Sequence, residues 1–256
     1  MNEDAVKPKE QKMFATEVVK ALVSDHETIT SQNAVEVNGL PGYEYFITET
    51  VNGEVKSKSY AMVALLAEAV VWPEVERYSR LQDALETAAN YGTYITTGGG
   101  PDFSIGLFQM KPSFVEEMEK AWMRSGLARQ YELWFDTADN ATARRIRISR
   151  LQKEEWQVIY VGVFLRLLYA SYGSFNKKGE RTQEGIETLP VKEQVRLAAT
   201  AYNRGVVWAA PGYGNLDRLR EHASEKHFHY AFIPSARTKR YCYATLAWKH
   251  YKKIAR

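Results

Sequence analysis

The chain has 256 residues, of which 45% are hydrophobic and 25% are charged, and its formal net charge at pH 7 is +3. These proportions are ordinary for a folded globular protein and exclude a disordered chain, a fibrous repeat and a small disulfide-held scaffold. The single cysteine excludes an internal disulfide. The small net charge gives no support to nucleic-acid binding. No apolar run reaches the length of about 20 residues that crosses a bilayer, so no integral membrane segment is expected.

Residues 1–59 are expected to form an N-terminal extension. Apolar side chains at helical spacing between Phe14 and Leu22 predict a short helix near the start. The segment Tyr43–Lys58 reads instead as two strands, because Asn52-Gly53 between Val51 and Glu54 is typical of a two-residue hairpin turn. The extension is therefore predicted to carry a small β-hairpin.

Residues 60–256 are expected to form one mainly α domain. Apolar residues between Val63 and Val70 follow the spacing of a helix face, and Pro73 is expected to interrupt this helix or to begin the next one. The segment 156–172 is apolar on nearly all sides, which marks a buried central helix. The composition of 174–190 and 206–236 favours loops. The other predicted helices are 112–122, 127–135, 142–151, 191–202 and 239–254.

Four arginines lie on the predicted helix 142–151. A run of like charges on a helix usually faces solvent, and we expect a solvated face here; the alternative is a surface that contacts anions. The arginines are Arg144, Arg145, Arg147 and Arg150.

The sequence gives little indication of a metal site or of a nucleotide-binding site. His227 and His229 have the spacing of ligands on a strand, but no third ligand lies near them and no His-Glu-x-x-His motif occurs. There is no Gly-x-x-x-x-Gly-Lys-Ser/Thr phosphate loop and no Gly-x-Ser-x-Gly nucleophile motif. We therefore expect no metal and no cofactor.

Two other segments combine residues that could bind a polar ligand. In 104–113, Gly106 permits close backbone approach, Gln109 offers both a donor and an acceptor, and Pro112 suits the start of a helix. In 197–205, Tyr202 and Asn203 stand at the end of a predicted helix, just before a glycine. Taken singly, each segment could equally be a plain helix boundary.

The combination resembles soluble lytic transglycosylases and related lysozyme-fold enzymes. Residues 106–113 (Gly-Leu-Phe-Gln-Met-Lys-Pro-Ser) are similar to the family's Gly-Leu-Met-Gln-x-x-Pro-x-Thr, and 199–205 (Ala-Thr-Ala-Tyr-Asn-Arg-Gly) to its Ala-x-Ala-Tyr-Asn-Ala-Gly. Residues 161–165 resemble part of the family's buried helix, and 237–241 its C-terminal Glu-Thr-Arg-x-Tyr element. These four elements follow the family order over roughly residues 60–252. The resemblance implies a lysozyme-like fold.

The family uses one catalytic glutamate upstream of the Gly-x-x-Gln element, and two residues here are candidates. Glu74 follows an apolar helix, as the catalytic residue does in the family, and lies 32 residues before Gly106. Glu86 lies only 20 residues before Gly106 but falls within a predicted helix without a preceding apolar run. We favour Glu74, although Val75 stands where the family has serine. Burial against Trp72 is expected to keep its carboxyl protonated.

The resemblance implies cleavage of the β-1,4 bond between N-acetylmuramic acid and N-acetylglucosamine in peptidoglycan, leaving a 1,6-anhydro product. Gln109, Asn203 and Ser104 would then bind substrate, and Tyr202 would lie close to the glutamate and the scissile sugar. The alternatives are hydrolysis by the same glutamate, as in a lysozyme, and an inactive module that only binds glycan or a partner protein. The implied partner is the glycan strand.

The resemblance also implies a periplasmic or cell-envelope location, if a signal peptide has been removed from the chain. The N-terminal residues Met1 to Asp4 are acidic and are followed by no apolar segment of the kind a signal peptide carries. We expect a monomer.

Overall fold

The computed structural model describes most of the chain from residue 27 onward. The described residues are 27–37, 40–51, 54–62, 64–76, 84, 87–88, 93–99, 102–131, 133–173, 185–204, 214–225, 227–228 and 240–255. The helix predicted near Phe14 and the candidate Glu86 lie outside them.

Three strands precede the helices. β1 (Glu27–Val37), β2 (Leu40–Val51) and β3 (Glu54–Met62) form an antiparallel sheet in the order β1-β2-β3. The register between the second and third strands pairs Val51 with Glu54. The division of the chain after residue 59 stays a prediction.

Beyond the sheet the described chain is mainly helical, which confirms the predicted α class. The longest helix is α7, whose apolar sequence predicted a central position. A 3-10 turn, η1 (Ile186–Thr188), precedes α8, and two-residue strands β4 (His227–Phe228) and β5 (Arg240–Tyr241) pair before α10. The helices are α2 (Ala64–Val75), α4 (Pro112–Ser125), α5 (Leu127–Gln130), α6 (Ala141–Leu151), α7 (Glu154–Tyr172), α8 (Val191–Arg204), α9 (Leu216–His222) and α10 (Tyr243–Ile254).

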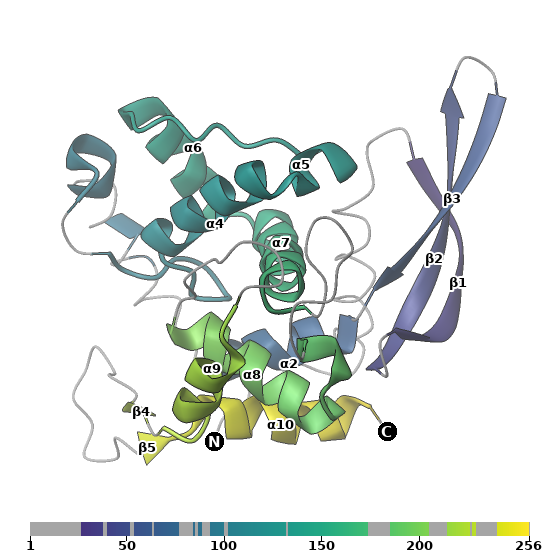
Figure 1. Cartoon of the computed structure of the whole chain (residues 1–256). Coiled ribbons are helices and arrows are strands. Elements are labelled where there is room, and N and C mark those ends of the chain that lie inside the picture. Colours follow the sequence, from purple (N-terminus) through teal and green to yellow (C-terminus); the bar gives the residue numbers. More distant parts are fainter. Residues whose placement is uncertain are drawn as a thin grey trace.

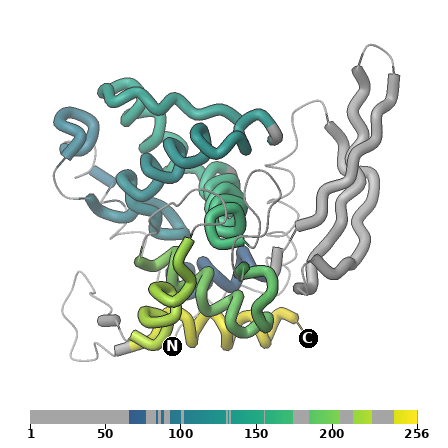
Figure 2. The backbone as a smooth tube through the Cα atoms, viewed as in Figure 1, coloured from purple at the N-terminus to yellow at the C-terminus, as the bar shows by residue number. Residues whose placement is uncertain are grey.

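Helix α7 lies between two groups of helices. Figures 1 and 2 show α4, α5 and α6 on one side of it and α2, α8, α9 and α10 on the other. α7 contacts α4 and α6 from the first group and α2 and α8 from the second. Its side chains Val163, Phe164 and Leu168 are fully buried in a hydrophobic cluster that both groups share. Most side chains of α7 are buried, which explains why its sequence is apolar on nearly all sides.

Three local predictions were wrong. Pro73 lies inside the last turn of α2 and does not break it: proline has no N–H to donate to the carbonyl four residues earlier, yet the helix continues to Val75. Helix α5 ends at Gln130, well before residue 135. Helix α9 forms within the segment expected to be a loop, and the Asn215 side chain caps its first turn by accepting from the amides of Asp217 and Arg218.

The arginine face of α6 is also not what the sequence indicated. Arg147 and its partner Glu119 on α4 are each only 1% exposed, and the Arg147 Nε donates to the Glu119 carboxylate at 2.8 Å. Tyr160 of α7 donates to the same carboxylate at 2.6 Å. Arg144 is also buried and donates to the carbonyl of Ile95 at 3.1 Å. These two arginines tie α6 to its neighbours, while Arg145 and Ile146 face solvent.

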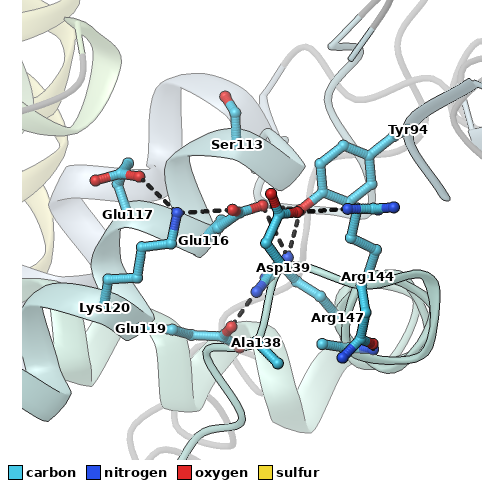
Figure 3. Close-up of polar contacts among 12 residues, drawn as sticks. Tyr94, Ser113, Glu116, Glu117, Glu119, Lys120, Ala138, Asp139, Arg144 and Arg147 are labelled. Atoms are coloured by element: carbon cyan, nitrogen blue, oxygen red, sulfur yellow. Dashed lines mark hydrogen bonds and ion pairs between the residues drawn. The ribbon is translucent and has the colours of Figure 1, made fainter. Parts of the chain in front are cut away.

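A second carboxylate extends this buried network toward the surface. Figure 3 shows Glu116 beside Arg147, whose guanidinium bonds to it at 3.0 Å, and beside the hydroxyl of Tyr94, which donates to it at 2.6 Å. Burial alone would raise the pKa of Glu116. The hydrogen bonds from Lys120 and Tyr94 and the charge of Arg147 outweigh burial and lower it. The network therefore holds Glu116 ionised and joins α4 to α6.

Candidate functional site

A cavity of about 1000 Å³ opens between the α4 side and the α8–α9 side of the molecule. Its lining comes from seven places: the end of α2, the turn before α4, the start of α4, the end of α7, the end of α8, α9 with the residues just before it, and β5. All five residues predicted from the sequence line it, although they span 130 positions of the chain. They are Glu74, Ser104, Gln109, Tyr202 and Asn203.

The turn that carries Gln109 is closed by an isolated antiparallel bridge. Ile105 and Met110 exchange both backbone hydrogen bonds, at 2.9 and 3.2 Å. Within the turn, Gly106 has φ of +75° and Gln109 has φ of 51°. Positive φ is common for glycine but rare for glutamine, and such conformations persist where the surroundings enforce them. The backbone of Gln109 is therefore held in an unusual conformation at the cavity wall.

Gln157 on α7 supports this turn from beneath. Its side chain is buried; the Oε1 accepts from the amide of Phe108 at 2.8 Å, and the Nε2 donates to the carbonyl of Leu151 at 2.8 Å. A Cβ on Gly106 would overlap the Gln157 amide nitrogen and lie 2.7 Å from the Leu151 carbonyl oxygen. Glycine at position 106 is thus required by packing as well as by backbone conformation.

Three predicted binding residues present polar groups to the cavity. The Gln109 Nε2 donates to the carbonyl of Gly106 at 2.9 Å, which fixes the side-chain amide and leaves its oxygen as an acceptor. The half-buried side chains of Ser104 and Asn203 form no hydrogen bond with the described part of the chain. An oxygen acceptor, a hydroxyl and an amide are thus available to a polar ligand.

Tyr202 forms part of the cavity floor. Its ring packs edge-on against Phe114 and Phe164, with centroids 6.1 and 5.3 Å away. Its hydroxyl donates to the carbonyl of Phe108 at 2.8 Å, which joins α8 to the Gln109 turn. Burial, and then the negative charge of Glu74, raise the pKa of Tyr202 well above its usual value. The phenol therefore stays neutral, and Glu74 lies near enough for its charge to matter.

We expect Tyr202→Phe to lower the free energy of unfolding by about 1–3 kcal/mol, because the buried hydrogen bond from the Tyr202 hydroxyl to the Phe108 carbonyl would be lost. Urea denaturation measures this change. Tyr169→Phe is a matched control, because its hydroxyl donates to a side chain, Gln194 Oε1, and not to the turn. Loss of stability in both variants, with altered ligand binding only in Tyr202→Phe, is the expected pattern. Unchanged stability of Tyr202→Phe would show that this hydrogen bond does not hold the turn.

Glu74 stands in the last turn of α2, half-buried at the cavity. The end of this helix is fixed by α10: the Tyr243 hydroxyl donates to the carbonyl of Val70 at 3.0 Å, and His250 bonds to Glu68 at 2.8 Å. Trp72, expected to shield Glu74, instead stacks on the His250 ring at 3.8 Å. Trp72 and Glu74 are two residues apart on a helix, so they point to different sides. The aromatic residues that line the same cavity are Phe114, Tyr172, Tyr202 and Tyr241.

Two further carboxylates line the cavity, and both are engaged by neighbours. Asp102 accepts from the Ser113 hydroxyl at 2.6 Å and from its amide at 3.1 Å, and so caps the start of α4. Glu117 is exposed and pairs with Lys120 at 3.1 Å. Neither arrangement is that of a base held ready to activate a water molecule.

Within the described residues, no group of three or more His, Cys, Asp or Glu side chains is arranged to hold a metal ion. In the same part of the chain, none of the helices has the length and apolar character needed to traverse a bilayer.

Sequence reasoning missed several residues of the cavity and its support. Gln157 carries no motif, and its role depends on a turn 49 positions earlier in the chain. Tyr172, Arg218 and His222 also line the cavity. The asparagine at position 215 was a usable signal for the helix that carries Arg218, because asparagine is a favoured N-cap.

The chain was also compared with known proteins. No protein-family model matches it, and neither the curated proteins nor the solved structures include a match.

Proposed function

We propose that this chain cleaves the β-1,4 bond between N-acetylmuramic acid and N-acetylglucosamine in peptidoglycan, with Glu74 as its one catalytic carboxyl and a 1,6-anhydro sugar as product. One observation carries the proposal. The five residues chosen by resemblance to lytic transglycosylases come from three separate parts of the sequence and line a single cavity. The proposal includes a lysozyme-like fold for residues 60–256, with the N-terminal hairpin as an addition to it.

The chemistry needs one group that first gives and then takes a proton. Glu74, protonated, donates its proton to the glycosidic oxygen as the bond from that oxygen to C1 of the muramic acid breaks. The carboxylate then accepts the proton of the C6 hydroxyl of the same sugar, whose oxygen bonds to C1. No water is consumed, and Glu74 ends in its original state. The half-buried setting near Tyr202 suits a carboxyl that must spend part of the cycle uncharged.

The polar groups around Glu74 suit an amide-bearing sugar. Gln109 offers a carbonyl oxygen to an N–H group, and Asn203 offers both a donor and an acceptor to an acetamido group or hydroxyl. Ser104 contributes a hydroxyl. We assign Tyr202 a positioning role. Its hydroxyl donates a hydrogen bond to the Phe108 carbonyl, so it supports the turn beneath the sugar.

Lysozyme-type hydrolysis is the rival, since the same glutamate could activate water. A second carboxylate usually assists hydrolysis, as nucleophile or as base. Asp102 caps a helix and Glu117 pairs with a lysine, so the described part of the cavity favours the intramolecular route. A location in the cell envelope follows from the proposed substrate.

Digestion of purified peptidoglycan with the intact chain, followed by mass spectrometry of the soluble products, tests the proposal. Fragments ending in 1,6-anhydro-muramic acid are expected, each one water lighter than a hydrolysis product. Reducing-end fragments of full mass would show a lysozyme. Binding without release of any fragment would show a glycan-binding module.

A further inference from the structure

The two sides of the cavity differ in charge. On the α4 side, Asp102 and Glu117 contribute carboxylates and Lys111 contributes an amino group. On the α8–α9 side, Arg204, Arg218 and His222 contribute the ionisable groups, and all of them are basic. Figure 1 shows these two sides as separate groups of helices, with α4 in one and α8 and α9 in the other. A ligand in the cavity therefore meets two carboxylates and one lysine on the α4 side, Glu74 at the end of α2, and basic groups on α8 and α9.

The basic side keeps an uncompensated charge. Glu225 pairs with both Arg204 and His222, so two of the three basic groups share one carboxylate. Arg218 forms no ion pair with any acid in the described part of the chain. Its neighbour Asp217 bonds instead to Arg220, at 3.0 Å. The Arg218 guanidinium thus borders the cavity without a carboxylate partner among the described residues.

The backbone that carries Arg218 is firmly held. The amide of Gly214 donates to the carbonyl of Ser171 at 2.7 Å, and Gly214 packs so closely on the Tyr172 ring that a Cβ would lie 2.6 Å from it. Leu216 and Leu219 anchor α9 in the core. Desolvation raises the pKa of Tyr172, and the charge of Arg218 opposes that rise, so the guanidinium acts on the same part of the cavity as the Tyr172 ring. A fixed backbone lowers the entropic cost of binding through a long side chain.

A guanidinium in this position suits a carboxylate, because its planar N–H groups match the two carboxylate oxygens. If the proposed function is right, the substrate supplies such groups on every second sugar. Muramic acid carries a lactyl side chain that ends either in a free carboxylate or in a peptide with carboxylates of its own, and N-acetylglucosamine carries none. We infer that Arg218 forms a subsite for a carboxylate on the muramic-acid side chain and so sets the register of the strand.

Binding of fluorescently labelled glycan strands, measured by anisotropy, tests this inference. Glu74→Gln serves as the background so that strands are not consumed. Three strands are compared: one bearing peptides, one stripped to its lactyl carboxylates, and one stripped strand whose carboxylates have been converted to amides. Arg218→Gln is the variant, and Arg145→Gln, which is exposed on α6 and outside the cavity, is the charge-matched control.

We expect Arg218→Gln to weaken binding of carboxylate-bearing strands about three- to tenfold, as for a partly exposed charge-assisted hydrogen bond, and to leave the amidated strand unaffected. Added salt should shrink the difference. An effect on the stripped strand alone assigns the subsite to the lactyl carboxylate, and an effect on the peptide-bearing strand alone assigns it to a peptide carboxylate. An effect on both strands means that either carboxylate can occupy the subsite. Equal weakening of binding to all three strands, or no weakening of binding to any of them, overturns the inference.

The inference and the proposed function fail in different ways. A chain that releases anhydro products while Arg218→Gln binds normally keeps the proposed function and loses the subsite. A chain that releases nothing but binds carboxylate strands through Arg218 keeps the subsite as that of a glycan-binding module. A chain that binds none of the strands loses both.

Discussion

Replacing Glu74 by glutamine is expected to slow peptidoglycan cleavage by about 10²–10⁴-fold, the usual contribution of a general acid–base residue. Glutamine keeps the shape and polarity of the side chain but can neither donate the carboxyl proton to the glycosidic oxygen nor accept one from the C6 hydroxyl. Release of soluble fragments from purified peptidoglycan measures the rate. The rate at which the anhydro product forms should fall by the same factor.

Glu117→Gln is the matched control for this experiment. Glu117 lines the same cavity but is exposed and paired with Lys120, so its loss should change the rate by less than threefold. Glu86→Gln completes the set, because Glu86 was the other candidate. If Glu86→Gln abolishes cleavage and Glu74→Gln does not, the catalytic assignment moves to Glu86. If every variant cleaves like the parent, the single-glutamate mechanism is wrong.

Arg147→Leu should lower the free energy of unfolding by about 3–5 kcal/mol, the cost of leaving one buried ion without its partner. Arg147 and Glu119 are each 1% exposed, and among the described residues Glu119 would keep Tyr160 and a longer contact to Arg150, at 3.4 Å. Urea denaturation followed by tryptophan fluorescence measures the loss. The effect should appear without any direct change at the cavity polar groups.

Two comparisons isolate the buried pair. Arg145→Leu removes a charge from the exposed face of the same helix and should change the unfolding free energy by no more than about 0.5 kcal/mol. The double variant Arg147→Leu/Glu119→Leu removes both ions and should be more stable than Arg147→Leu alone. Equal stabilities for Arg147→Leu and Arg145→Leu would mean that the ion pair contributes nothing.

The arginines of α6 show where reasoning from the sequence stopped. A charged stripe on one helix says nothing of what the next helix presents, and the partner of Arg147 lies 28 positions earlier, on α4. By contrast, segment 156–172 is apolar on nearly all sides, a pattern that can be interpreted without knowing the neighbouring helices, and α7 is the central helix it predicted. Short-range sequence patterns therefore predicted the helices, but they did not predict polar pairs between residues far apart in the chain.

Reasoning from the sequence also predicted only part of the candidate site. Close approach at Gly106 was predicted, but the group that approaches is Gln157 of the protein itself. The positive φ of Gln109 had no sequence signal, since glutamine has no preference for that conformation. The five predicted site residues that line the cavity were chosen by resemblance, and their chemical roles stay predictions.

The contact between Gly106 and Gln157 bears on how this sequence can change over evolutionary time. No side chain larger than hydrogen fits at 106 while the glutamine amide is in place, and without that amide the Phe108 backbone loses its acceptor. A change at either position alone therefore disturbs the turn. Homologous chains that keep this turn should keep glycine at 106 even where Gln157 is replaced, because the positive φ and the Leu151 carbonyl still exclude a side chain.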